Sequence, residues 1–155
     1  MSALWQILEP ACVELELKAD RKEEALAEMV ALLVGAGKFR EPAALLEALK
    51  AREKMVSTGV GEGIAIPHCA SQELSAPAFA VARKRAGLPF DALDGQPVRL
   101  LFLLVGVKGQ PTAQLRLLSR LARLLRDPDF PEALLAAGSP AEVLELLRRA
   151  EQEEG

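Results

Sequence analysis

The sequence is poor in the residues on which many nucleic-acid sites depend. It has no tyrosine and one tryptophan, and aromatic residues make up 4% of its 155 residues. Little material is therefore present for stacking exposed bases. Its 19 lysine and arginine residues are outnumbered by 22 aspartate and glutamate residues, so the formal charge is −3. Without a basic excess to bind a phosphate backbone, we expect no nucleic acid among its partners.

Cysteine and histidine are scarce too. The chain has two cysteines, Cys12 and Cys69, and a single histidine, His68. Two cysteines cannot form a disulfide framework, and a zinc site built from both of them and His68 would lack a fourth ligand. The sequence therefore predicts no metal centre and no cofactor, and we interpret both cysteines as small core residues.

Long hydrophobic runs are also missing. The longest, residues 100–105, is far too short to span a bilayer, and the N-terminus lacks the segments of a secretory signal. We expect a protein of the reducing cytoplasm with no membrane insertion. Half the residues are hydrophobic, which at this length suffices for one core. We expect one domain over residues 1–150, followed by a frayed acidic tail at 151–155.

The first quarter of the chain predicts a strand and a helix. Hydrophobic and charged residues alternate over residues 13–17, the pattern of a half-buried strand. Asp20 and Glu23 predict an N-cap and its capping-box partner for the helix that follows. We expect this helix to end at Gly35 or Gly37.

The rest of the chain divides by the same rules. Residues 56–63, VSTGVGEG, contain three glycines without a helical period and predict a loop. Residues 98–107 are almost continuously apolar and predict a central strand covered on both faces. The other predicted elements are helices at 42–54, 111–126, 130–135 and from Ser139 through 147, and strands at 64–66 and 79–83. Together they predict a single compact α/β (α+β) domain, a mixed β-sheet flanked by helices.

His68 is the strongest candidate for chemistry. It follows the glycine-rich segment, a short buried strand and Pro67. A neutral imidazole is a good nucleophile, Pro67 stiffens the chain before it, and a glycine-rich loop can turn backbone N–H groups towards an anion. Arg52, just before the loop, could supply a guanidinium fork for phosphate. This combination favours phosphoryl transfer, and the alternative is a surface histidine after a tight turn.

Three other interpretations are weaker. A thiol dyad of Cys69 and His68 is disfavoured because neighbours in an extended segment point to opposite sides. The loop at 56–63 lacks the Gly-Lys-Ser/Thr ending of a P-loop, and it follows a helix where a dinucleotide-binding loop follows a strand. A functional role for the arginine-rich stretch at 114–126 is also disfavoured, because in an acidic chain it is most simply a solvated helix face.

The residues around His68 also carry a family resemblance. Arg52-Glu53, Ser57-Thr58-Gly59-Val60-Gly61 and the run from Gly63 to Pro67-His68 resemble the phosphorylation-site region of one class of bacterial protein. These are the fructose/mannitol-type enzyme IIA domains of the phosphoenolpyruvate-dependent phosphotransferase system, which include the nitrogen-regulatory IIA proteins. The resemblance runs from about Trp5 to Arg148.

The resemblance implies a phosphocarrier. In that family the histidine at the place of His68 accepts phosphate from the phosphocarrier HPr or its nitrogen-pathway counterpart. It then passes the group to a cysteine of a sugar permease IIB domain, or keeps it as a regulatory mark. Arg52 matches an arginine beside the phosphohistidine, and Thr58 lies in the adjoining loop. We predict that Arg52 and the loop amides near Thr58 and Gly59 hold the phosphoryl oxygens.

Two positions depart from the family pattern. Gln114 stands where members often carry a second histidine, and Cys69 stands where the residue is commonly small or glycine. We predict that Gln114 donates one neutral hydrogen bond to the phosphoryl group, and the alternative is a solvent-facing residue at the start of its helix. Glu62 matches a position that is often acidic or polar, and we assign it no role.

Two alternative functions remain open at this point. The chain could be a regulatory protein-binding module that is switched by phosphorylation of His68, because that modification adds about −1.5 to −2 charges. It could also be a degenerate scaffold that takes no phosphate, although the intact motif at His68 argues against this. The sequence leaves open the reacting nitrogen of His68, the sugar, if any, and the oligomeric state.

Overall fold

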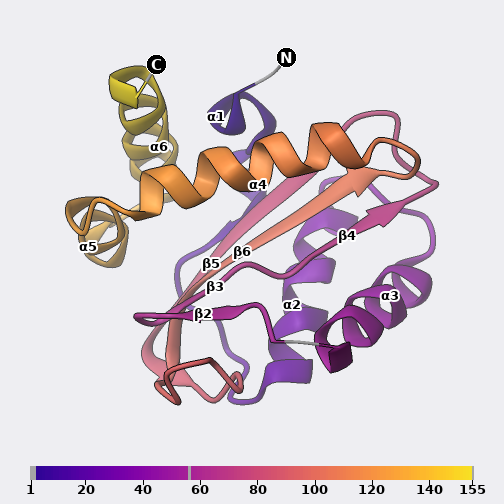
Figure 1. The fold of residues 1–155 in the computed structure, drawn as a ribbon, viewed down its shortest axis with the longest axis horizontal. Helices are drawn as coiled ribbons and strands as arrows, with labels where there is room; N and C mark the ends of the chain where they lie inside the picture. Colours follow the sequence, from indigo (N-terminus) through magenta and orange to yellow (C-terminus); the bar gives the residue numbers. More distant parts are fainter. Residues whose placement is uncertain (1–2, 56, 155) are drawn as a thin grey trace.

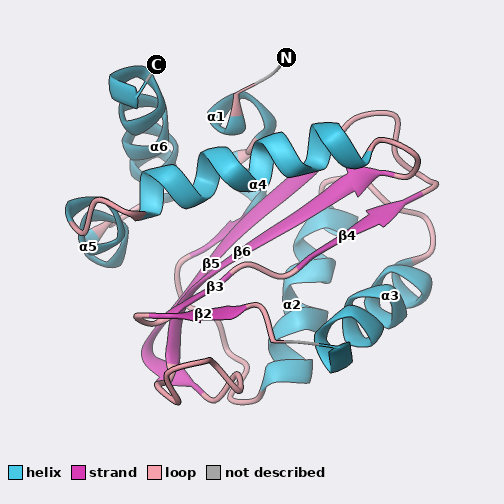
Figure 2. Ribbon diagram, in the orientation of Figure 1, coloured by secondary structure: helices cyan, strands magenta, loops and turns pink. Residues whose placement is uncertain are grey.

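The computed structural model describes residues 3–55 and 57–154, and there the chain forms a mixed β-sheet flanked by helices (Figures 1 and 2). This confirms the fold predicted from the sequence. The elements in chain order are α1 (Leu4–Ile7), the 3₁₀-helix η1 (Pro10–Cys12), β1 (Val13–Glu14), α2 (Lys22–Gly35), α3 (Pro42–Met55), β2 (Gly59–Gly61), β3 (Ile64–Ala65), β4 (His68–Ser71), β5 (Ala78–Leu88), β6 (Val98–Val107), α4 (Pro111–Leu125), α5 (Asp129–Ala136) and α6 (Pro140–Glu154).

The sheet is built around β6. Its strand order is β1-β5-β6-β3-β2, with β4 also paired to β6. β5 runs antiparallel to β6, whereas β3 and β4 run parallel to it. Residues 100–106 of β6 are all buried, as expected for a strand covered on both faces. The bounds of β6 are those predicted for the central apolar strand.

Helices cover both faces of this sheet. Figure 1 shows α4 across one face and α2 with α3 on the other, and α6 lies beside α1 at one side of the molecule. The core between the layers is apolar, and the rings of Phe79 and Phe102 stack with their centroids 6.4 Å apart. No helix within the described residues is both long and apolar enough to cross a bilayer.

A break at Pro67 separates β3 from β4. β3 pairs with the first half of β6 through Ile64 and Leu100, and β4 pairs with the second half through His68 and Leu104. Pro67 has no N–H to give to a ladder, but its carbonyl accepts the Leu104 N–H at 3.0 Å. The predicted strand stop at Pro67 is confirmed. The return to the sheet at His68 was not predicted, and it fixes the backbone of the candidate nucleophile.

The opening segment corrects two predictions. The strand predicted over 13–17 comprises only Val13–Glu14, although the Leu17 N–H still donates to the Arg83 carbonyl at 2.9 Å. The predicted capping box of Asp20 and Glu23 is wrong, because the N-cap of α2 is Arg21 and no side chain bonds to the helix end there. The Asp20 carboxylate instead pairs with Lys84 at 3.0 Å.

The glycine-rich loop and the tail each contain more structure than predicted. Residues 59–61 form β2, which pairs antiparallel with β3, so the loop prediction for 56–63 is wrong there; residue 56 lies outside the described residues. Residues 151–154 of the acidic tail are helical, because α6 continues to Glu154, so the fraying predicted for the tail is wrong there; residue 155 lies outside the described residues. The Glu151 carboxylate accepts the backbone N–H groups of Leu4 and Trp5 at 2.9 and 2.7 Å, which ties α6 to α1. The domain boundary at residue 150 remains a prediction.

Candidate functional site

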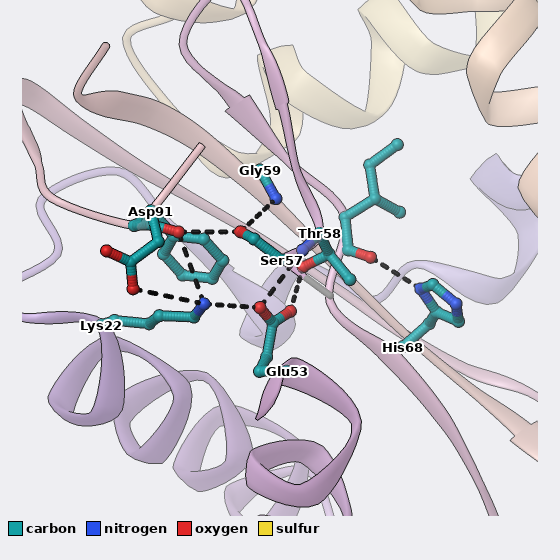
Figure 3. A network of polar contacts seen from close by, with 9 residues as sticks. Lys22, Glu53, Ser57, Thr58, Gly59, His68 and Asp91 are labelled. Carbon is teal, nitrogen blue, oxygen red and sulfur yellow. Dashed lines mark hydrogen bonds and ion pairs between the residues drawn. The ribbon is translucent and has the colours of Figure 1, made fainter. Parts of the chain in front are cut away.

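The His68 imidazole is oriented by a main-chain carbonyl two residues earlier. Its Nδ1 lies 2.8 Å from the carbonyl oxygen of Ile66, and the side chain is half-buried (Figure 3). A carbonyl oxygen can only accept a hydrogen bond, so Nδ1 is the donor and carries a proton. In the neutral side chain the lone pair is then on Nε2. Nε2 is therefore the nitrogen able to act as a nucleophile.

The segment that supplies this carbonyl is itself anchored to the glycine-rich segment. The Ile66 N–H donates to the Thr58 carbonyl at 2.9 Å. Because Pro67 fixes its own backbone angle and restricts the residue before it, the Ile66 carbonyl has little freedom to turn away from His68. The orientation of the imidazole thus depends on where Thr58 is held.

Thr58 and Gly59 are engaged with protein acceptors. Thr58 is buried, and its N–H donates to Glu53 Oε2 at 3.2 Å while its hydroxyl donates to the other carboxylate oxygen. The Gly59 N–H donates to the Ser57 hydroxyl at 3.0 Å. Direct binding of phosphoryl oxygens by Thr58 and Gly59 therefore stays a prediction, because both N–H groups would first have to leave these acceptors.

Glu53 and Lys22 are site residues to which the sequence analysis gave no role. Glu53 lies four and eight residues after Leu49 and Leu45, so it falls on the buried face of α3. A charged residue in an apolar stripe is the signal that could have identified it. Lys22, at the start of α2, places its Nζ 2.7 Å from Glu53 Oε2. No spacing in the sequence predicts that α2 contributes to this site.

Arg52 lies in the last turn of α3 and is half-buried. α3 packs against β4, the strand that begins with His68. The helix therefore brings Arg52 to the side of the sheet that carries the histidine. Contact of its guanidinium with a phosphoryl group stays a prediction.

Gln114 lies in the first turn of α4, over the edge of the sheet. Its Nε2 donates to the Cys69 carbonyl at 2.7 Å, one residue along from His68. Gly106 permits this approach, because a Cβ there would lie 3.1 Å from the Gln114 amide carbon. The alternative that Gln114 faces solvent is wrong. Its hydrogen bond to a phosphoryl group stays a prediction.

The remaining candidates have weaker links to phosphoryl chemistry. Burial raises the pKa of the Cys69 thiol to about 12, so the thiol is protonated near neutral pH and the dyad with His68 is disfavoured. The Glu62 N–H donates to the Asp94 carboxylate at 2.8 Å. This hydrogen bond and the one from the Gln96 N–H lower the pKa of the exposed Asp94 carboxyl. Within the described residues, no three His, Cys, Asp or Glu side chains gather to hold a metal ion.

Comparison with protein families identifies the chain. The family described as "Phosphoenolpyruvate-dependent sugar phosphotransferase system, EIIA 2" matches residues 6–150. The chain belongs to this enzyme IIA family. This confirms the resemblance found around His68, and the match covers nearly the whole chain.

Relatives of this enzyme IIA chain include sugar-specific and nitrogen-regulatory proteins. A fructose-specific EIIA component of Haloferax volcanii is 38% identical over 135 residues, which are 87% of this chain and 88% of that protein. A nitrogen regulatory protein of Bradyrhizobium diazoefficiens is 37% identical over 134 residues, 86% and 87% of the two chains. The fructose-specific EIIABC component of Bacillus subtilis is longer: the chain matches it at 35% identity but spans only 23% of its length.

Solved structures support the same assignment. The nitrogen regulatory protein IIA-Ntr of Neisseria meningitidis superposes on this enzyme IIA with a TM-score of 0.86 at 33% identity, covering 93% of this chain and 98% of that one. A complex of the mannitol enzyme IIA and phosphorylated enzyme IIB of Escherichia coli superposes with a TM-score of 0.77 at 26% identity, covering 92% and 97%.

Proposed function

We propose that this enzyme IIA is a phosphocarrier with His68 as the phosphorylated residue. The observation that carries the proposal is the hydrogen bond from Nδ1 to the Ile66 carbonyl, which leaves the lone pair on Nε2. Nε2 forms the new P–N bond as the P–N bond of a donor phosphohistidine breaks, and the donor nitrogen leaves with the electron pair. Because Nε2 carries no proton, no base is needed to deprotonate His68 in this step.

Arg52 and Gln114 are proposed to stabilise the transferring group. Phosphoryl transfer has a loose transition state, so catalysis consists mostly of positioning and of neutralising charge on the three equatorial oxygens. A guanidinium at Arg52 provides the charge, and Gln114 adds one neutral donor beside the Cys69 carbonyl. Before transfer, the N–H groups of Thr58 and Gly59 donate to Glu53 and to the Ser57 hydroxyl. They would bind phosphoryl oxygens only after leaving these acceptors.

Two protein partners follow from this function. The donor is an HPr-like phosphohistidine protein, and the acceptor is the cysteine of a sugar permease IIB domain. Similarity to the mannitol enzyme IIA that was solved in complex with phosphorylated enzyme IIB supports the second. We propose a cytoplasmic location on the strength of these partners.

A regulatory function is the second candidate. The superposition on the nitrogen regulatory IIA-Ntr, with a TM-score of 0.86, favours it. In this case the phosphate on His68 is the output, because about −1.5 to −2 charges added at one site change which proteins bind there. Transfer of the phosphate from this chain to a purified IIB domain distinguishes transport from regulation.

Phosphorylation with purified components tests the proposal. The chain is incubated with phosphoenolpyruvate, enzyme I and HPr, and acid-labile phosphate is measured by intact-mass spectrometry. We expect one phosphate per wild-type chain and none on His68→Ala, with an unchanged circular dichroism spectrum. Stoichiometric labelling of His68→Ala would show that the phosphate is carried elsewhere, and an unlabelled wild type would reject the phosphocarrier function.

A further inference from the structure

Glu53 combines burial, charge and proximity to the histidine segment, and its side chain offers very little surface to a donor protein. Its side chain is 5% exposed. We propose that Glu53, held by Lys22, is a positioning residue that fixes the His68 segment through Thr58 and so keeps the imidazole in its Nδ1–H form. The expected effect of Glu53 on phosphoryl transfer rests on the proposed function. Its expected effect on the position of the imidazole proton does not.

A series of hydrogen bonds joins Glu53 to the imidazole, and Figure 3 shows its two ends, at Glu53 with Thr58 and at His68. The Glu53 carboxylate accepts both the N–H and the hydroxyl of Thr58. The Thr58 carbonyl accepts the Ile66 N–H at 2.9 Å, and the Ile66 carbonyl accepts His68 Nδ1–H at 2.8 Å. Each residue in the series is bonded to the one before it, and Ile66 is also flanked by Ala65 and Pro67, which are held by β6. A shift of the Glu53 carboxylate is therefore passed on to the imidazole.

Lys22 holds this carboxylate in place. Its Nζ lies 2.7 Å from Glu53 Oε2, 3.4 Å from the Phe90 carbonyl and 4.7 Å from the centre of the Phe90 ring. A buried carboxylate without a cation would be costly, so the ammonium of Lys22 offsets part of the cost of burying Glu53. The Ser57 hydroxyl also donates to the Phe90 carbonyl, at 2.8 Å. Lys22 of α2 thus contacts both Glu53 of α3 and Phe90 in the segment after β5.

A second buried glutamate gives a matched comparison. Glu151 is also 5% exposed, accepts two backbone N–H groups, from Leu4 and Trp5, and lies 3.7 Å from Arg120 Nη1. Its chemistry is that of Glu53, but it anchors α1 rather than the histidine segment. Glu151→Gln therefore reports what losing a buried, ion-paired carboxylate does to the protein in general.

The effect of Glu53→Gln on the imidazole follows from the geometry. A glutamine can still bond to Thr58 if the hydroxyl turns round, and its amide oxygen can accept from the Lys22 ammonium. It has no charge to attract that ammonium, so the group that holds Thr58 is bound less firmly in its place. An imidazole released from the Ile66 carbonyl favours a proton on Nε2, the form preferred by free histidine, and Nε2 then has no lone pair. Misplacement by about 1 Å far from the chemistry slows a reaction up to about a hundredfold.

Imidazole ¹⁵N NMR measures the positioning directly, because the chain has one histidine and its signals need no assignment. At a pH where the imidazole is neutral, we expect the wild type and Glu151→Gln to show the Nδ1–H form. Glu53→Gln and Thr58→Val should show a larger Nε2–H fraction, and Thr58→Ser, which keeps the hydroxyl, should restore the wild-type spectrum. An Nδ1–H spectrum unchanged in both Glu53→Gln and Thr58→Val overturns the proposal.

Transfer kinetics from phosphorylated HPr provide the second readout. We expect kcat of Glu53→Gln to fall by about ten- to a hundredfold with KM for the donor little changed, because the Glu53 side chain has little surface for a partner to contact. Glu151→Gln should transfer within about twofold of wild type. Equal loss in both variants would make Glu53 merely structural. A wild type that accepts no phosphate would reject the proposed function, while the NMR comparison would still test the positioning.

Discussion

The His68 imidazole is set up by its immediate neighbours in the chain. Pro67 breaks the strand, Ile66 supplies the acceptor at 2.8 Å, and β4 begins at the histidine itself. The sequence predicted the strand break at Pro67, which is confirmed, and His68 as the candidate nucleophile, because glycine-rich segments and prolines act locally. It left the reacting nitrogen open, because that depends on which carbonyl faces the ring, and the structure points to Nε2.

Replacement of Arg52 should affect transfer more than folding. A cation in the last turn of a helix contributes about 0.3–1 kcal/mol to stability. Loss of a charged hydrogen bond to the transferring group costs about 1.5–3 kcal/mol, so Arg52→Ala should transfer roughly ten- to a hundredfold more slowly. Arg52→Lys should recover only part of the rate, since an ammonium cannot form the bidentate fork. Rapid-quench measurement of transfer from phosphorylated HPr checks this, and a wild-type rate for Arg52→Ala would remove Arg52 from the site.

Replacement of Gln114 should change the lifetime of the phosphorylated protein. Charge-assisted hydrogen bonds are roughly twice as strong as neutral ones, so a protonated histidine at 114 should hold the phosphate more tightly by about 1 kcal/mol. Gln114→His should slow hydrolysis of phospho-His68 below about pH 6.5, where the added imidazole is charged, and do little at about pH 8.5. The half-life is measured at both pH values, with Gln114→Ala as the control. Identical half-lives in all three proteins would place Gln114 outside the site.

At the scale of elements, a buried arginine joins the end of α5 to the sheet. Arg83 of β5 is 4% exposed, and its guanidinium donates to the carbonyls of Leu134, Leu135 and Ala137 at 2.7–3.2 Å and to that of Leu15 at 3.1 Å. Burial lowers the pKa of this guanidinium, and the carbonyl oxygens at a helix end favour a cation. Arg83 therefore satisfies the carbonyl groups at the end of a helix that has no glycine cap.

Loss of Arg83 should destabilise the whole domain. Arg83→Met keeps most of the side-chain length but leaves several buried carbonyls without a donor, and we expect the free energy of unfolding to fall by about 3 kcal/mol. Arg85→Met, at an exposed position of the same strand, should change it by no more than about 0.5 kcal/mol. Urea unfolding followed by circular dichroism gives both values. A similar effect of the two substitutions would contradict the role assigned to Arg83.

The elements that the sequence predicted well are those with a strong period or a fixed breaker. The central strand at 98–107 is almost continuously apolar, and Pro42 begins its helix as expected. The prediction at Asp20 and Glu23 was wrong because Lys84, distant in sequence, pairs with Asp20. The strand at 59–61 was missed because its pairing with β3 outweighs the poor strand propensity of glycine.

At the scale of the whole molecule, the candidate site lies apart from the first and last helices, α1 and α6. Figure 1 shows α1 and α6 at the side of the molecule away from β2 and α3. The contacts of Glu151 fix that side, while the His68 segment is fixed from α2 and α3 through Glu53. Local motifs predicted the family, which is confirmed, and His68 as the nucleophile, which stays a prediction. The contributions of Lys22 and of the Cys69 carbonyl could not be predicted, because they depend on how the helices pack against the sheet.

The position of phosphate on the single imidazole tests the central claim most directly. The ¹⁵N-labelled chain is phosphorylated with phosphoenolpyruvate, enzyme I and HPr, and its imidazole nitrogens are observed by NMR. We predict phosphorus coupling at Nε2 of His68, with Nδ1 keeping the proton that it donates to the Ile66 carbonyl. Phosphorus on Nδ1, or an unmodified imidazole in a phosphorylated chain, would contradict the account.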